Sequence, residues 1–465
     1  MIKKVSPMLI IILSFLLVIF IGSILLILPI SYNNGNIGAN EKWDYVDALF
    51  TAVSAVCVTG LSPVSNFGAT LTTFGKVVTG ILIQIGGLGF VTVAIFVLTM
   101  IGAKIGPAQR YLVSNALNTN TASGMVRLVR DIVLITFSIE LVGFVLNLFV
   151  FVPYFVDNPS LAVGVSLFHA VSAFNNCGLD VLGLGNSFED PYFQSNILFN
   201  INTSLLIILG GVGFIVIRDV LTNKKWRKLS VHSKIVLKMS AALIIVGSVL
   251  LFLAELGNPS YKWYHAIFQS IGCRTAGFST ISFLSLNGIS IVIMIILMFI
   301  GASPSSTGGG IKTTTLYVLI KSAFSFAKGK TAFSYGRAIS NETKIRALLL
   351  VIFAVVSILL GMVIILSIEI GIGSGSGFNN VGIDSEADLT IGMVLFETTS
   401  AFSTVGYSIG VTYKLHGVSK MVLCVLMFIG RLGPLTILST WNKRWNIISK
   451  QNNDVQYLEE KIIIG

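Results

Sequence analysis

The sequence predicts an all-α membrane protein built from four tandem helix–loop–helix repeats. Of its 465 residues, 54% are hydrophobic and only 11% are charged, whereas a soluble globular domain carries about 25% charged residues. The mean hydropathy is +0.87, and apolar runs of about 20 residues or more recur, long enough to cross a bilayer as helices. A short apolar segment that ends in a glycine occurs four times, which indicates internal repetition.

The first apolar run lies at the N-terminus and is predicted to be a transmembrane helix. After Lys3 and Lys4 the chain is apolar as far as Pro29. This run of about 20 residues is longer than the apolar region of a secretory signal. No small-residue cleavage site follows it, so we expect the segment to remain in the protein as its first membrane helix.

The net charge of +11 is distributed in a way that indicates membrane topology and not nucleic-acid binding. Of the 31 Lys and Arg residues, 24 lie in the N-terminus, the C-terminal tail and three segments at about 102–130, 218–238 and 312–346. This positive-inside pattern predicts that both termini are cytoplasmic. Thirteen of the 20 acidic residues lie on the opposite side or in the short segments, where they would attract cations. The alternate connections hold five basic residues: Lys42, Lys76, Lys262, Lys414 and Lys420.

Each repeat is expected to contain a first helix, a short segment that enters the membrane without crossing it, and a second helix. About 12 apolar residues precede the glycine of each short segment, too few to span a bilayer. The four glycines are Gly60, Gly178, Gly277 and Gly406. The repeats span about residues 8–102, 126–222, 232–322 and 344–442 of a transmembrane domain at 1–445, and a cytoplasmic tail follows at 446–465.

Four half-helices that each end at a glycine predict a pore with pseudo-fourfold symmetry. Non-helical backbone at membrane depth is tolerated only where it is buried or lines a water-filled cavity, and glycine adopts unusual dihedrals at low cost. The carbonyl oxygens of such loops can replace the water shell of a cation, and the carboxyl end of a half-helix dipole favours a cation. The alternative is that the glycines only pack helices against one another.

The fourth loop indicates which cation is bound. Residues Thr404-Val-Gly-Tyr-Ser408 differ at one position from TVGYG, the filter signature of potassium channels. The complete prediction is eight transmembrane helices and four re-entrant pore helices around a pseudo-fourfold pore, with K+ bound at the loops. The predicted selectivity-filter residues are Val58, Thr59, Gly60, Asn176, Cys177, Gly178, Thr275, Ala276, Gly277, Thr404, Val405 and Gly406.

The second helix of the third repeat is interrupted by a segment that we interpret as a gate. Residues 301–310 include a proline and three consecutive glycines between strongly apolar flanks, and these residues are costly in a helix interior. The alternative is a kinked helix packed on a neighbour. The predicted gate residues are Ala302, Ser303, Pro304, Ser305, Ser306, Thr307, Gly308, Gly309, Gly310 and, from the fourth repeat, Arg431.

Three ionisable residues at membrane depth need an interpretation, because such residues are usually functional. Arg431 stands where the first two repeats have glycine, and we expect either a fixed charge on the pore axis or a packing residue paired with a carbonyl. Arg274 lies inside the third loop and is expected to be a structural brace, with Glu397 as its partner. His169 is expected to be an ordinary buried polar residue.

Five motifs distributed over the four repeats carry a family resemblance. They are Gln84–Phe90, Phe168–Asn176, Arg274–Phe278, Gly310–Thr314 and Phe428–Pro434. Together they resemble the Trk/Ktr/HKT superfamily of potassium transporters, and within it the KtrB-type membrane subunits of bacterial Ktr systems, over about residues 8–442.

The resemblance implies an activity, a location and partners. The activity is potassium uptake through the bacterial cell (plasma) membrane by a homodimer with one pore per subunit. The partner is a KtrA-type cytoplasmic ring that binds nucleotides. K+ would be the transported ion, Na+ a candidate coupling ion, and no cofactor is implied. The chain departs from familiar family sequences at Cys57, Cys177, Cys273 and Pro304.

Other readings of the sequence remain open. The potassium-translocating subunit of an ATP-driven pump shares a four-repeat pore, but we expect it to carry additional helices. An enzyme is not indicated, because the chain has no Walker motif, no HExxH and no Cys/His cluster; the cysteines are interpreted as small packed residues. Channel-like flow, sodium coupling and proton coupling all fit the same residues. The terminal Ile462–Gly465 segment is expected to dock on a partner subunit.

Overall fold

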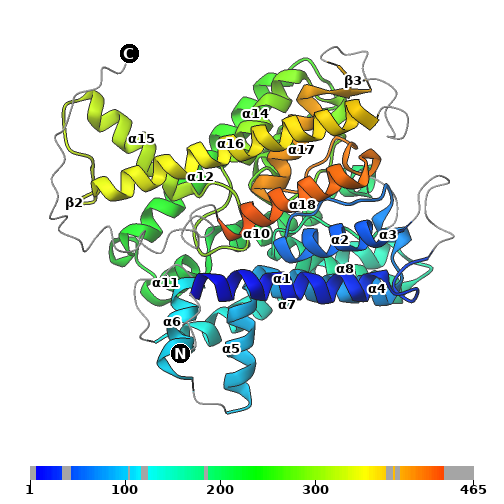
Figure 1. Cartoon of the computed structure of the whole chain (residues 1–465), viewed down its shortest axis with the longest axis horizontal. Helices are drawn as coiled ribbons and strands as arrows, with labels where there is room; N and C mark the ends of the chain where they lie inside the picture. The colour runs from blue at the N-terminus through cyan, green and yellow to red at the C-terminus, as the bar shows by residue number, and fades with distance from the viewer. Residues whose placement is uncertain are drawn as a thin grey trace.

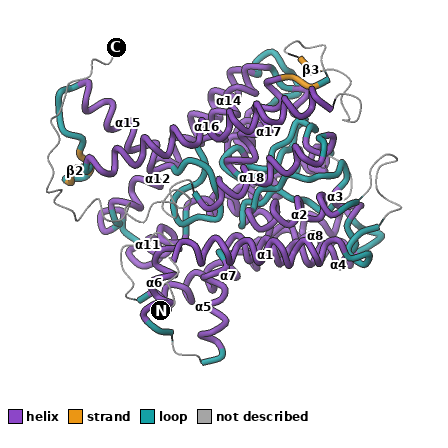
Figure 2. Tube along the Cα trace, viewed as in Figure 1, coloured by secondary structure: helices purple, strands orange, loops and turns teal. Residues whose placement is uncertain are grey.

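The structure, a computed structural model, is mostly helical (Figures 1 and 2). Within its described part, four helices are long and apolar enough to cross a membrane, or up to six when each of two bent helix pairs counts as one span. The C-terminal tail, including Ile462–Gly465, lies outside the described residues. The structure describes residues 7–33, 43–102, 105–116, 124–182, 187–372, 381–382 and 388–433.

The first two repeats follow the same order of elements. A long helix is followed by a shorter one and then by a pair of helices joined at a glycine. The first contains α1 (Pro7–Ile27), α2 (Tyr45–Cys57), α3 (Phe67–Thr70), α4 (Thr73–Leu88) and α5 (Phe90–Met100), followed by α6 (Pro107–Ala116). The second contains α7 (Met125–Tyr154), α8 (Pro159–Phe174), η2 (Ser187–Glu189), α9 (Pro191–Ser195), α10 (Ile197–Val212) and α11 (Phe214–Asn223).

The last two repeats begin in the same way but differ in their second halves. The third contains η3 (Trp226–Lys228), α12 (Val231–Ala254), α13 (Trp263–Gly272), η4 (Phe283–Ser285), α14 (Gly288–Phe299), α15 (Thr313–Ala327), β1 (Phe333–Ser334) and β2 (Arg337–Ala338). The fourth contains α16 (Asn341–Ile372), β3 (Val381–Gly382), β4 (Leu389–Thr390), α17 (Ile391–Ser403), η5 (Thr412–Lys414) and α18 (Gly417–Leu432).

Two small strand pairs are an addition to the predicted all-α fold. Strands β1 and β2 pair antiparallel across Tyr335 and Gly336, which have φ angles of 47° and 77°. Two successive positive φ angles are the requirement of a tight hairpin turn. Strands β3 and β4 pair in parallel. Each strand has two residues, so the fold remains helical.

In each repeat a short helix follows the long first helix, and these four are α2, α8, α13 and α17. Three of the four begin with a side-chain cap. Asp44 accepts a hydrogen bond from the Asp47 amide at 2.9 Å, and Asp47 accepts one from the Asp44 amide at 3.4 Å. This reciprocal capping box satisfies amide groups that a helix N-terminus leaves free. Asn158 caps α8 and Thr390 caps α17 in the same position, whereas α13 has no side-chain cap.

The short helices connect the repeats in a closed circle. Each packs against the first helix of its own repeat and also against the second helix of the preceding repeat. Thus α8 contacts α4, α13 contacts α10, α17 contacts α14, and α2 contacts α18. Figure 1 shows α16, α17 and α14 on the opposite side of the molecule from α5 and α6.

The second helices of the first two repeats are bent, which the sequence analysis did not anticipate. Helices α4 and α5 meet at 96° across Gly89, and α10 and α11 meet at 97° across Gly213. Both glycines have positive φ angles, as does Gly433 after α18, and a left-handed residue ends a regular helix. In the third repeat, helix ends at Phe299 and resumes at Thr313, so residues 301–310 are not helical, as predicted.

One ion pair fastens the first short helix to the last helix. Lys420 on α18 donates to the Asp47 carboxylate at 2.9 Å and to the Pro63 carbonyl at 3.1 Å, and all three groups are buried. The assignment of Lys420 to a connection is therefore wrong, and Lys76 also lies within a helix, α4. The contact explains why a lysine is tolerated there, since its charge has a partner.

We expect Lys420→Met to destabilise the protein by about 3–5 kcal/mol, because the substitution leaves the buried Asp47 carboxylate without its partner. The double variant Asp47→Asn with Lys420→Met should recover most of the loss. Thermal unfolding of the detergent-solubilised variants measures the effect. Equal stability of Lys420→Met and the unmodified protein would contradict the structural role of this pair.

Candidate functional site

Four loops with the same backbone conformation follow the short helices. In each loop, the residue two positions before the glycine is left-handed: Val58, Asn176, Thr275 and Thr404 have φ angles of 57°, 59°, 70° and 51°. Left-handed backbone is unfavourable for β-branched residues such as valine and threonine, and such strain concentrates at functional sites. The glycines also have positive φ angles, from 73° at Gly277 to 99° at Gly60.

The amide groups of these loops are turned back onto the short helices. In the first loop, the Thr59 amide donates to the Ser54 carbonyl at 2.8 Å and the Gly60 amide donates to Ser54 Oγ at 3.1 Å. The fourth loop repeats both bonds: Val405 to the Ser400 carbonyl, and Gly406 to Ser400 Oγ. None of the hydrogen bonds found among the described residues uses a carbonyl of residues 58–60 or 404–406 as acceptor.

The four glycines touch one another's loops in a closed ring. A Cβ atom placed on Gly178 would lie 2.7 Å from the Ala276 carbonyl oxygen, and one on Gly277 would lie 2.6 Å from the Val405 oxygen. A Cβ on Gly406 would overlap the Thr59 oxygen, and one on Gly60 would overlap the Cys177 oxygen. The structure therefore brings together all four loops predicted from the sequence, in the order of the repeats, and a side chain at any glycine would disturb this contact.

A cavity of about 540 Å³ opens on one side of the ring. All four glycines line it and are half-buried, whereas the residues directly before them are buried. Asp180 and Glu189 contribute acidic groups to its wall, and Lys414 contributes a basic one. The cavity therefore ends at the ring glycines, and the residues that precede them lie behind its wall.

Tyr407 braces the fourth loop against the third repeat. Its hydroxyl donates to Gln269 Oε1 at 2.8 Å and lies 2.9 Å from the Phe278 carbonyl oxygen. The side chain is 1% exposed, and a Cβ on Gly272 would overlap the hydroxyl. Gly272 therefore makes room for the tyrosine, which fixes the distance between two adjacent loops.

Arg274 is a brace, as predicted, but its predicted partner is wrong. Its guanidinium donates to Ser240 Oγ on α12 at 3.1 Å, and the residue is 7% exposed. Glu397 instead accepts hydrogen bonds within its own repeat, from Ser408 Oγ at 2.6 Å and Thr412 Oγ1 at 2.7 Å. The carboxylate is satisfied by hydroxyl groups of the loop that follows it in the chain, a partnership that charge pairing did not suggest.

The prediction that His169 is a buried polar residue is confirmed. It is 3% exposed, and its Nε2 lies 2.9 Å from Thr203 Oγ1. The rings of Phe151, Phe188 and Phe199 surround it. The residue packs the second repeat and also contacts the aromatic side chain of Phe278, which follows Gly277 in the third loop.

The predicted gate segment lies directly against the ring, on the side away from the 540 Å³ cavity. The Gly309 amide donates to Thr404 Oγ1 at 2.9 Å, and a Cβ on Gly308 would overlap the Thr275 hydroxyl. The Ser303 amide donates to the Gly211 carbonyl at 3.1 Å. Residues 301–310 thus contact the third and fourth loops and the end of α10, with a further cavity of about 400 Å³ beyond them.

Two basic residues hold this segment in place. Arg431 donates to the carbonyl oxygens of Thr307 and Gly86, so it pairs with carbonyls and contacts the gate segment at the same time. Lys312 Nζ donates to the Gly308 carbonyl at 2.6 Å and to the Gly309 carbonyl at 3.3 Å. Sequence reasoning did not assign Lys312 to the site; a lysine two positions after three consecutive glycines within an apolar stretch was the available signal.

Three serines that bind the loop amides were also not identified from the sequence. Ser54, Ser172 and Ser400 each precede the ring glycine by six residues and are each followed by alanine. Their carbonyls accept the loop amides at 2.8–2.9 Å, and all three residues are buried. The repeated Ser-Ala pair was the signal. Its third-repeat counterpart is shifted: Ser270 bonds to Ile244 on α12.

The cysteines near the ring are buried and free. Cys57, Cys177 and Cys273 are each 0% exposed, in agreement with their interpretation as small packed residues. Among the described residues, no group of three or more His, Cys, Asp or Glu side chains could hold a metal ion.

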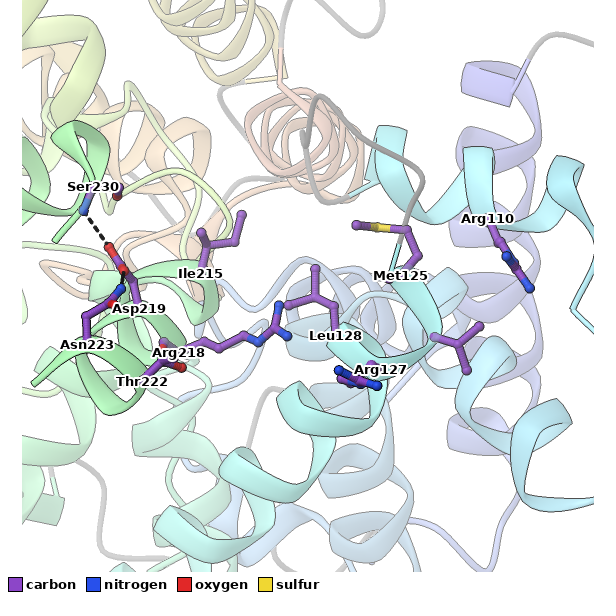
Figure 3. Close-up of a pocket in the computed structure, with 12 residues that line it drawn as sticks. Arg110, Met125, Arg127, Leu128, Ile215, Arg218, Asp219, Thr222, Asn223 and Ser230 are labelled. Carbon is purple, nitrogen blue, oxygen red and sulfur yellow. Dashed lines mark hydrogen bonds between the residues drawn. The ribbon is translucent and has the colours of Figure 1, made fainter. Parts of the chain in front are cut away.

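A separate cavity of about 840 Å³ lies among helices α6, α7 and α11 and is lined by three arginines (Figure 3). Arg218 pairs with Asp131 at 3.1 Å, and Asp219 accepts a bond from the Ser230 amide at 2.9 Å. Arg110 and Arg127 come from the other two helices. This basic region lies in segments that the positive-inside pattern assigns to the cytoplasm.

The family follows from a comparison with known proteins. A family model described as TrkH, a cation transport protein, matches residues 6–445. The chain belongs to the TrkH family of cation transport proteins. It is therefore a transporter and not an enzyme.

Two relatives match this TrkH-family chain over almost its whole length. The identity is 34% over 473 residues to the Ktr system potassium uptake protein B of Bacillus subtilis (strain 168), with 99% of this chain and 97% of that protein covered. It is 35% over 474 residues to the potassium/sodium uptake protein NtpJ of Enterococcus hirae, with 100% and 98% covered.

A solved structure shares the TrkH-family fold. The crystal structure of the potassium transporter TrkH from Vibrio parahaemolyticus matches with a TM-score of 0.68 and 17% sequence identity. The match covers 95% of this chain and 86% of that one. At this identity the likeness concerns the fold alone.

In this TrkH-family chain, we expect Tyr407→Phe to lower stability by about 1–3 kcal/mol, because Gln269 Oε1 would lose a buried donor. Thermal unfolding in detergent is the measurement. Tyr413→Phe is the matched control, since its hydroxyl forms no hydrogen bond with the described residues. An unfolding temperature that falls equally in both variants would argue against the bracing role of Tyr407.

Proposed function

We propose that this chain is the ion-translocating membrane subunit of a potassium uptake system, with the ring of four loops as its selectivity filter. The closed contact between Gly60, Gly178, Gly277 and Gly406 supports this proposal most strongly. Both relatives are named as potassium uptake proteins, one of them for sodium as well. They cover this chain from end to end, which does not favour the alternative of a subunit from an ATP-driven pump.

The proposed filter selects ions through backbone geometry. The loop amides are bonded to the short helices, so the carbonyls of the predicted filter residues are free to replace the water shell of K+. The carboxyl ends of α2, α8, α13 and α17 add negative partial charge near the ion. The acidic groups of Asp180 and Glu189 raise the local cation concentration in the outer cavity.

The same proposal assigns the helices to a membrane. Each repeat would supply two transmembrane segments, eight in all, and the four short helices would be re-entrant. The first helices α1, α7, α12 and α16 are each long enough to span. The second segments would be the bent or broken pairs and α18, within a domain at 1–445 whose termini are both cytoplasmic. The positive-inside pattern supports this orientation.

Residues 301–310 are proposed to gate the pore. They occupy the side of the filter opposite the outer cavity, and the positively charged Arg431 and Lys312 bind their carbonyls. Charge-assisted hydrogen bonds are worth about 1.5–3 kcal/mol each. Ions would therefore pass when these bonds break and the small-residue segment moves, which its glycines make sterically inexpensive.

A regulatory partner is proposed on the cytoplasmic side. One relative is named as a component of a Ktr system, which implies a second subunit; we infer a KtrA-type ring that binds nucleotides, on a homodimer of this chain. Basic residues at 224–228 and 328–337, with the arginine-lined cavity in Figure 3, offer a platform for it. Sodium is the candidate coupling ion, since the second relative is named for potassium and sodium.

We expect Gly406→Ser to lower the preference for K+ over Na+ by about tenfold or more, or to abolish uptake, since about 1.4 kcal/mol changes a binding ratio tenfold. The new side chain would overlap the Thr59 carbonyl oxygen and displace one quadrant of the ring. Uptake of K+ into proteoliposomes, with and without competing Na+, is the measurement.

Gly410→Ser is the matched control for this experiment. Gly410 has a similar φ angle, 83° compared with 93° for Gly406, but its Cβ would meet only Tyr413, at 3.7 Å. The control separates backbone strain from damage to the ring. Unchanged ion preference in Gly406→Ser, in a protein that folds and transports, would remove the filter assignment.

We expect Arg431→Ala, and separately a deletion within residues 302–309, to raise the K+ flux. Loss of the bond to Thr307 should shift the balance between closed and open segments by about tenfold. Arg130→Ala, an exposed arginine on α7, is the control for loss of a positive charge. Lower flux in both folded gate variants would show that the segment is structural.

A further inference from the structure

Glu140 is an acidic residue in the middle of α7, directly behind the second loop of the ring. It is 4% exposed. Its Oε1 accepts a hydrogen bond from Asn175 Nδ2 at 3.0 Å, and its Oε2 accepts one from Gln84 Nε2 at 3.1 Å. A buried carboxylate within a membrane helix is energetically costly and is usually retained for function. Here both of its oxygens are bonded to amide donors.

Asn175 is the residue through which Glu140 reaches the ring. It ends α8, directly before Asn176, Cys177 and Gly178. Its Nδ2 also donates to Gln84 Oε1 at 2.8 Å and to the Val171 carbonyl at 2.9 Å. The three side chains Glu140, Gln84 and Asn175 thus form a closed triangle of hydrogen bonds that joins α7, α4 and the second loop.

Close packing leaves Asn175 little freedom to move. A Cβ on Gly87 would overlap the Asn175 amide group, so the side chain lies flat against the end of α4. The carbonyl oxygens of Gly86 and Gly87 accept bonds from Arg431. The end of α4 therefore touches the ring through Asn175 and the gate segment through Arg431.

We propose that Glu140 and Gln84 are positioning residues that set the ion preference of the ring by holding Asn175. The inference rests on the proposed function of the ring as a potassium filter. The ion preference of a carbonyl ring depends on how its oxygens surround the ion, and supporting hydrogen bonds hold such an arrangement in place. The triangle fixes the residue that precedes the Asn176 and Cys177 carbonyls.

The third repeat also holds its loop from behind at this position, but with an arginine in place of an asparagine. Arg274 precedes Gly277 by three residues, as Asn175 precedes Gly178, and it is held by Ser240 on the first helix of its own repeat. The first and fourth repeats have small residues at this position, Cys57 and Ser403. Two of the four loops are therefore anchored from behind by a polar side chain at this position, and Glu140 is the carboxylate that holds one of these side chains, Asn175.

The triangle requires one acid and one amide at residues 84 and 140. Asn175 Nδ2 donates to both partners, so each must present an oxygen to it. The other polar atoms of these two side chains, Gln84 Nε2 and Glu140 Oε2, then face each other. One carboxylate and one amide satisfy this contact, whereas two amides place donor against donor in a buried site.

The experiment compares Glu140→Gln with the double variant Gln84→Glu plus Glu140→Gln. We expect Glu140→Gln to reduce the preference for K+ over Na+ in proteoliposome uptake by about tenfold, the order expected for one buried hydrogen bond lost. The double variant exchanges the acid and the amide and can form all three bonds again. It should restore most of the ion preference, which a general loss of packing would not allow.

Glu369→Gln is the control for removal of a buried carboxylate. Glu369 on α16 is 0% exposed and accepts bonds from the His416 amide and Ser419, away from the loops. We expect it to change thermal stability without changing ion preference. Thermal unfolding of every variant in detergent accompanies the transport measurement.

The outcomes separate this inference from the proposed function. If the unmodified protein takes up no K+ selectively, the proposed function itself fails. If it is selective and Glu140→Gln keeps the same preference, only the positioning role of Glu140 is overturned. A double variant no more selective than Glu140→Gln would also overturn the exchange of roles between Gln84 and Glu140.

Discussion

The need to satisfy the backbone polar groups of buried, non-helical segments is the constraint on which the rest of the structure depends. Four chain segments leave the helical conformation inside the protein, where unpaired amides and carbonyls are costly. In three of the loops, a backbone amide donates a hydrogen bond to the carbonyl of a serine in the preceding short helix, which is Ser54, Ser172 or Ser400. The carbonyls of residues 58–60 and 404–406 accept none of the hydrogen bonds found among the described residues, and under the proposed function a dehydrated cation satisfies them.

This solution holds only if the four loops support one another. Each glycine lies against a carbonyl of the next loop, and each short helix packs on the preceding repeat. Tyr407, Lys420 and Asn175 then bond across repeat boundaries. Because the repeats belong to one chain, these braces can differ from one quadrant to the next. The same asymmetry permits the non-helical segment 301–310 in the third repeat.

Particular residues show how far the sequence could be interpreted. The four ring glycines and the segment 301–310 were predicted correctly as non-helical, since their composition excludes a regular helix. The bends at Gly89 and Gly213 were missed, because glycines within an apolar run also occur in straight membrane helices. Glu397 was assigned to Arg274 by charge alone, yet hydroxyl groups nearby in its own loop satisfy it.

By itself the sequence determined the membrane class, the four repeats and the positions of the ring glycines, because these depend on local properties: apolar length, spacing and the conformational freedom of glycine. Only the tertiary structure decided which loops touch, that Lys312 and Arg431 hold the gate segment, and that Glu140 stands behind Asn175. These pairings join residues far apart in the chain. Their partners are chosen by the packing of helices, which no local pattern of residues specifies.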